Sequence, residues 1–116
     1  MMIRDIANLR FEPAYGVCYQ HLYPHAGEEA ADWGCGYAVL EANRQTVPHR
    51  HEENEAFVVL SGHGTMAVGE ETARVTAPSM VLIPGDLTHW LRNDSDTEPL
   101  VFLSIYWPAS FGAIDL

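Results

Sequence analysis

Two histidines and a glutamate stand close together in the segment 48–55, which reads Pro-His-Arg-His-Glu-Glu-Asn-Glu. Side chains of an extended chain alternate between its two faces, so His49 and His51 point to the same side. Their Cα atoms lie about 6.6 Å apart at the usual strand rise, which lets two imidazoles reach one ion. Glu55 opens the next strand after a short acidic turn and can add a carboxylate oxygen. The segment therefore predicts a metal site.

A fourth candidate ligand, His89, follows later in the chain, just after the turn residues Pro84-Gly85-Asp86. An isolated His-x-His pair is a weak signal, but agreement of spacing, turns and strand pattern over four residues is a strong one. Three imidazoles and one carboxylate suit one divalent ion of Zn, Fe, Mn, Ni or Cu, with zinc slightly favoured. Four protein ligands leave an open coordination position, which is typical of catalytic rather than structural sites.

The spacing of these ligands resembles the first motif of the cupin family, G-x5-H-x-H-x3-E-x6-G. Here the motif reads His49, His51, Glu55 and Gly62, with every internal spacing kept. Its leading glycine is replaced by Asn43. The departure concerns a turn and leaves the ligands in place.

The second cupin motif, G-x5-P-x-G-x2-H-x3-N, is similar to a later part of the chain. It reads here as Pro84, His89 and Asn93, and its two glycines are replaced by Pro78 and Asp86. The resemblance covers roughly residues 37–107. It implies an all-β fold, the double-stranded β-helix or jelly-roll barrel. It also implies a metal near one mouth of the barrel, held by the three histidines and the glutamate named above.

The strand pattern of the chain agrees with a barrel, because short apolar runs are separated by Gly, Pro and acidic turns. Helix signals are weak, and only residues 5–10 suggest a single turn. The extended runs cover residues 17–23, 36–42, 45–51, 55–60, 65–68, 73–76, 80–83, 89–93 and 100–107.

Alternation along these strands indicates which side chains line the site. Phe57 shares the face of Glu55, while Leu91 and Asn93 share the face of His89. We expect these three residues and Tyr37 to form the substrate pocket or the core below it.

The last strand offers a candidate catalytic residue. Tyr106 can donate a hydrogen bond or a proton, but only one of Tyr106 and Trp107 can face inward. The remaining histidines, His21, His25 and His63, lie outside the motifs, and we expect them on loops or the surface.

The composition restricts the function classes. The chain has 116 residues, which predicts one domain with an N-terminal arm of about residues 1–14, a barrel core of about 15–107 and a short C-terminal tail. Its net charge of −10 argues against nucleic acid and anionic membranes as partners. We find no apolar leader or spanning segment, and Cys18 and Cys35 form no disulfide framework, so a cytoplasmic location is expected.

Several functions remain open at this point. The first is a metal-dependent enzyme acting on a small organic substrate, with the ion as a Lewis acid or as an O2 site. The second follows from a similarity of segments 46–49 and 102–107 to the zinc cupins of hydrazine synthetases. Those cupins work beside an aminoacyl-tRNA-synthetase-like partner and form an N–N bond by rearranging an aminoacyl ester of an N-hydroxylated diamino acid. The third is a non-catalytic cupin that binds a small molecule. A homodimer is expected in each case.

Overall fold

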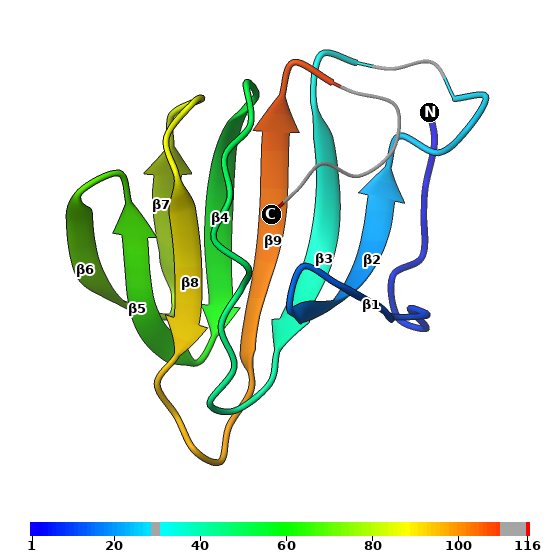
Figure 1. Cartoon of the computed structure of the whole chain (residues 1–116). Coiled ribbons are helices and arrows are strands. Elements are labelled where there is room, and N and C mark those ends of the chain that lie inside the picture. The colour runs from blue at the N-terminus through cyan, green and yellow to red at the C-terminus, as the bar shows by residue number, and fades with distance from the viewer. Residues whose placement is uncertain (29–30, 110–115) are drawn as a thin grey trace.

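The computed structural model describes residues 1–28, 31–109 and 116 (Figure 1). These residues form nine strands and no α-helix, and none of their segments is a helix able to cross a membrane. The strands are β1 (Glu12–Ala14), β2 (Val17–Tyr23), β3 (Gly34–Leu40), β4 (Asn54–Ser61), β5 (His63–Val68), β6 (Glu71–Thr76), β7 (Ser79–Ile83), β8 (His89–Asn93) and β9 (Leu100–Trp107).

The strands form two antiparallel sheets. A six-stranded sheet has the order β1-β2-β3-β9-β4-β7, and a three-stranded sheet has the order β6-β5-β8. Buried side chains from both sheets, including Phe57, Phe102 and Leu91, pack into one apolar core. The rings of Phe57 and Phe102 lie 4.4 Å apart between centroids. This arrangement confirms the all-β jelly-roll fold.

Strand alternation sets which side chains enter the core. Every second residue of β9 is buried, so Tyr106 faces inward and Trp107 faces outward, which the sequence left open. β3 alternates in the same way, with Gly34, Gly36 and Ala38 on the buried face. The period of two is the expected pattern for strands with one face on a core.

The segment 45–51 is not the regular strand that its pattern predicts. It runs beside β8 and contributes only two isolated bridges, Gln45 to Arg92 and His49 to His89. The two bridges differ by one residue in register, so the pairing with β8 is interrupted between them. In Figure 1 the segment that joins β3 to β4 rises from the lower to the upper end of the barrel. The upper end holds the first residues of β4 and β8 and the last residues of β9.

Two of the three residues that replace motif glycines keep the backbone conformation of a glycine. Asn43 has a φ of 60° and Asp86 a φ of 65°, while the retained Gly62 has a φ of 90°. Asparagine and aspartate tolerate the left-handed region better than other non-glycine residues. These two departures from the cupin motifs therefore preserve the turns that precede the expected ligands.

Candidate metal centre

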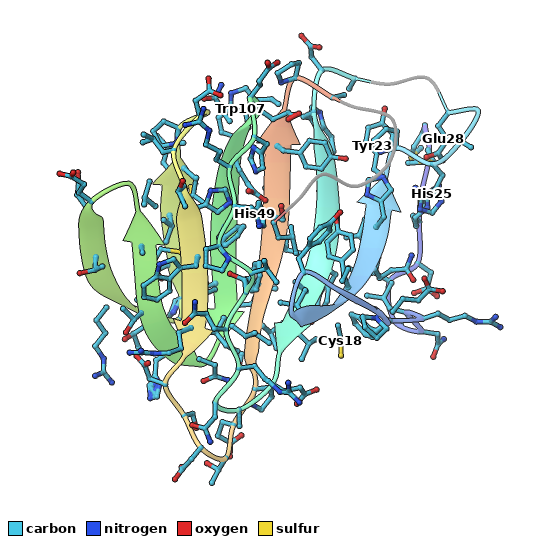
Figure 2. All side chains as sticks on the ribbon, in the orientation of Figure 1. Cys18, Tyr23, His25, Glu28, His49 and Trp107 are labelled. Carbon is cyan, nitrogen blue, oxygen red and sulfur yellow. The ribbon has the colours of Figure 1, made fainter. Side chains whose placement is uncertain are left out.

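Three histidine rings converge at the upper end of the barrel. The bridge between His49 and His89 sets these residues directly opposite each other, and their ring centroids lie 5.1 Å apart. The ring of His51 lies 5.1 Å from that of His89 and 6.0 Å from that of His49. One nitrogen from each ring lies within 4.8 Å of the other two. Figure 2 shows His49 between β8 and β9 in that view.

The three rings share one hydrogen-bonding pattern. Nδ1 of His49 lies 2.5 Å from the Val47 carbonyl oxygen. Nδ1 of His51 lies 2.9 Å from the carbonyl oxygen of Glu53, and Nδ1 of His89 lies 3.1 Å from that of Leu87. A carbonyl accepts only from an N–H, so the proton belongs on Nδ1 in each ring. This leaves Nε2 to act as a ligand, as is usual for histidines that bind a metal.

The free nitrogens have the property expected of metal ligands. Nε2 of His49 and Nε2 of His89 are buried, and neither has a hydrogen-bond partner among the described residues. Buried polar atoms almost always have a hydrogen-bond partner, so two unpaired nitrogen atoms in one cluster require an explanation. A divalent ion between the rings would supply the missing partner. The donor set thus fits a metal of the kind that histidine nitrogen prefers.

Glu55 lies at the edge of this cluster and is fully buried. Its Oε1 is 3.1 Å from Nε2 of His51 and 3.3 Å from Nε2 of His89, while Oε2 accepts a hydrogen bond from Ser104. Burial alone would raise the pKa of Glu55, but the adjacent His51 and His89 rings and the hydrogen bond from Ser104 outweigh it and lower that pKa. Burial likewise opposes the charge on His51, and the contact with Glu55 outweighs it and raises the pKa of His51. Glu55 is therefore a carboxylate beside two of the three imidazoles.

A turn before β8 supports the segment that carries His51. The Asp86 amide donates to the His51 carbonyl oxygen at 2.7 Å, and the Gly85 amide donates to Oδ1 of Asn54 at 3.0 Å. A Cβ on Gly85 would lie 2.2 Å from the carbonyl oxygen of Glu52, so only glycine allows this approach. The turn and the ligand segment therefore form one packed unit.

The expected pocket residues separate into two groups. Phe57 and Leu91 are buried on the predicted face, and the Phe57 ring lies edge-on to His89 at 6.3 Å. Tyr106 is also fully buried and faces inward from β9. These three residues lie in the interior at or below the histidine cluster.

Two of the predicted pocket residues do not line the histidine cluster. Tyr37 is on the outer face of β3, where its ring packs 5.7 Å from that of Phe11. Asn93 is buried, but its amide is fully used. It donates to the carbonyl oxygens of Leu40 and Glu98 and accepts from the amide of Ser95. Asn93 therefore ties loops together at the opposite end of β8 from His89.

The structure adds residues that the sequence reasoning missed. His21 was expected on a loop or the surface, but it belongs to β2 and its ring stacks on Tyr106 at 6.5 Å. Ser104 and Tyr19 are buried on the inner faces of β9 and β2. All three share strand parity with core residues, and that parity is the signal that could have found them. In Figure 2, Tyr23, His25 and Glu28 lie on the other side of β3 from His49.

Comparisons with known proteins agree with this geometry. A family model described as a cupin domain matches residues 36–106. The structure is similar to a cupin 2 conserved barrel domain protein from Salinispora arenicola, with 23% identity, a TM-score of 0.76 and coverage of 94% of this chain and 90% of that one. A cupin 2 domain-containing protein from Halorhodospira halophila shows 26% identity and a TM-score of 0.75 over 88% of this chain and 72% of that one.

A shorter stretch of the chain is similar to a protein named H2HPP isomerase from Bacillus subtilis. The two are 38% identical over 52 residues, which is 44% of this chain and 22% of that protein. The match thus spans about a fifth of that relative. The family model, in contrast, covers more than half of the sequence, from β3 to the end of β9. This chain belongs to the cupin family.

Proposed function

We propose that this protein is a metal-dependent enzyme that acts on a small organic substrate. His49, His51, His89 and Glu55 hold one divalent ion near the mouth of the barrel. The observation that carries the proposal is the convergence of three Nε2 atoms, two of them buried without a partner, in rings whose Nδ1 atoms are all fixed by carbonyl oxygens.

Glu55 is the fourth ligand in this proposal. Its Oε1 already lies within hydrogen-bonding distance of two of the three ligand nitrogens. Ser104 holds the other oxygen, so the carboxylate cannot rotate away without losing a buried hydrogen bond. In metal sites, a hydrogen bond from a second residue commonly holds a ligand side chain in its orientation.

The chemistry we infer is Lewis-acid catalysis without a net redox change. A bound divalent ion with an open position polarises a carbonyl oxygen or lowers the pKa of a bound water. The similarity to a protein named as an isomerase supports this choice over oxygenase chemistry. The chain's own residues contribute a fixed carboxylate at Glu55 and, at Tyr106, a phenol at the same end of the interior.

The test is the metal content of the purified protein and its variants, measured by elemental analysis. We expect one divalent ion per chain in the wild type and loss of that ion in His51→Ala. His63→Ala is the matched control, because His63 begins β5 outside the histidine cluster, and it should keep the ion. A wild-type metal content in His51→Ala would show that the ligand assignment is wrong.

A second measurement separates the reaction classes. The protein stripped of metal is loaded with Zn²⁺ or, without oxygen, with Fe²⁺, and oxygen uptake is then followed with small oxo acids as trial substrates. We expect no uptake with either ion. Uptake that requires both Fe²⁺ and the acid would favour the oxygenase alternative.

A further inference from the structure

Two tyrosines cross β3 in opposite directions over two glycines. A Cβ on Gly34 would lie 2.4 Å from the hydroxyl of Tyr106, and a Cβ on Gly36 would lie 2.0 Å from that of Tyr19. Tyr106 reaches over β3 from β9, and Tyr19 reaches over it from β2. The absence of side chains at both glycines therefore makes room for two phenols in the interior.

The hydroxyl of Tyr19 is an unpaired polar group in the barrel interior. Tyr19 is only 6% exposed, and its hydroxyl has no hydrogen-bond partner among the described residues. Burial raises the pKa of Tyr19 well above its ordinary value, and the nearby Tyr106 and Glu55 add to that shift. The phenol thus keeps its proton and offers a donor. Leaving such a group unpaired is costly unless a ligand or a water completes it.

His21, two residues after Tyr19 on β2, offers an unpaired acceptor. His21 is the cross-strand partner of Gly36, the residue on which the Tyr19 hydroxyl rests. Its Nε2 lies 2.5 Å from the carbonyl oxygen of Pro24 and so carries the proton, which leaves a lone pair on Nδ1. Nδ1 is buried and has no partner in the described part of the chain. Burial also lowers the pKa of His21, which keeps the ring neutral.

Both groups lie toward the candidate metal centre. Gly36 pairs with Ser104 on β9, and Ser104 donates to Glu55. The ring of His21 stacks on Tyr106, which pairs with Glu55 across β9 and β4. β2, which carries Tyr19 and His21, is therefore joined through β3 and β9 to β4, which carries Glu55, and Glu55 is near enough to add to the raised pKa of Tyr19.

We propose that Tyr19 and His21 bind a hydroxyl group of the substrate other than the oxygens that face the metal. A hydroxyl is the complementary group, because its oxygen accepts from Tyr19 while its hydrogen is donated to Nδ1 of His21. A divalent ion held by His49, His51, His89 and Glu55 would have room for the two oxygens of a 2-hydroxy or 2-oxo acid. The substrate class is thus a small 2-hydroxy or 2-oxo carboxylic acid with a further hydroxyl. This inference rests on the proposed function.

The experiment compares acids that differ by one hydroxyl, on Zn²⁺-loaded protein by calorimetric titration. Glycerate is paired with lactate, 2,4-dihydroxybutyrate with 2-hydroxybutyrate, and 2,5-dihydroxypentanoate with 2-hydroxypentanoate. In at least one pair we expect the hydroxylated acid to bind about ten-fold more tightly, as one or two net hydrogen bonds allow. Tyr19→Phe and His21→Phe should each remove the preference. Tyr37→Phe is the matched control on the outer face of β3 and should keep it.

Two results would overturn the inference. One is the absence of a hydroxyl preference, or of any binding, in all three pairs. The other is a preference that persists in Tyr19→Phe. Either result with normal loss of metal in His51→Ala would leave the proposed function standing, whereas metal retention in His51→Ala would remove the proposed function itself.

A stability measurement tests the unpaired hydroxyl independently of any ligand or metal. Removing a buried hydroxyl that has no partner should leave the melting temperature of the metal-free protein unchanged or raise it. We therefore expect Tyr19→Phe to melt at or above the wild-type temperature. A drop of several degrees would show that the hydroxyl has a structural partner and would contradict the assignment of Tyr19 to the ligand.

Discussion

The amide of Asp86 donates a hydrogen bond to the carbonyl oxygen of His51 at 2.7 Å, and Asp86 adopts a φ of 65°. This hydrogen bond thus joins the turn before β8, which leads to His89, to the segment before β4, which carries His51. The position of His51 depends on a backbone conformation that few residues adopt readily. Asp86 is itself exposed, so the role belongs to its backbone rather than to a buried side chain.

The effect of a substitution at Asp86 on stability should therefore depend on how easily the new residue adopts a positive φ. Asp86→Gly should leave stability nearly unchanged, because glycine adopts positive φ freely. Asp86→Val should lower the free energy of unfolding by about 1–3 kcal/mol, since a β-branched residue is strained in that region. It should also weaken Zn²⁺ binding through His51. Urea unfolding and calorimetric zinc titration measure the two effects. Equal stability of the glycine and valine variants would contradict this reasoning.

Ser104 and Ser79 form a matched pair for testing the support of Glu55. Ser104 donates to the Glu55 carboxylate, whereas the buried hydroxyl of Ser79 has no partner among the described residues. Ser104→Ala should weaken Zn²⁺ binding by about 10–100-fold, the usual effect of removing a group that orients a ligand. Ser79→Ala should change neither zinc affinity nor stability appreciably. Competition titration with a zinc chelator gives the affinities, and an identical affinity in both variants would contradict a role for Ser104.

The close approach of Tyr19 to Gly36 predicts a strong coupling between these positions. Gly36→Ala places a methyl group 2.0 Å from the present hydroxyl of Tyr19, so the ring must move. Overpacking of this kind should lower the free energy of unfolding by about 1–3 kcal/mol. In a Tyr19→Leu background the same substitution should cost much less. A double-mutant cycle from urea unfolding measures the coupling, and additive effects would show that the two residues do not constrain each other.

The sequence predicted the strands best where alternation and turn residues agree. β8 and β9 have the bounds expected from the sequence, and the buried positions of Phe57 and Leu91 followed from parity with the ligands. The face of a strand on which a residue lies depends only on the two-residue period, so it can be predicted without knowing the neighbouring strands.

The sequence-based predictions failed where contacts with neighbouring strands determine the position of a residue. Residues 45–51 look extended, but a one-residue shift interrupts their pairing with β8, and the segment forms only isolated bridges. Tyr37 is aromatic and near the motif, yet the register of β3 turns it outward. His21 could be placed only once β2 was known to pair with β3, because that pairing brings it next to the glycine that accommodates Tyr19. The sequence alone predicts the candidate ligands, whereas the groups around them depend on the register of the sheets.

The partly buried position of His21 predicts a pH dependence of stability in the metal-free protein. Burial lowers the pKa of His21, and the charges of His25 and Arg4 lower it further. The contact with the Pro24 carbonyl and the charge of Glu28 raise the pKa but do not outweigh burial. The unfolded chain takes up this proton near pH 6.5 and the folded chain only at lower pH. The contribution of neutral His21 is therefore complete above about pH 6.5 and is lost as the pH falls through the folded pKa. Wild type should lose stability relative to His21→Gln over that window. Urea unfolding at a series of pH values measures the difference, and NMR titration of the His21 ring should give a midpoint below 6.5; a midpoint above it would refute the prediction.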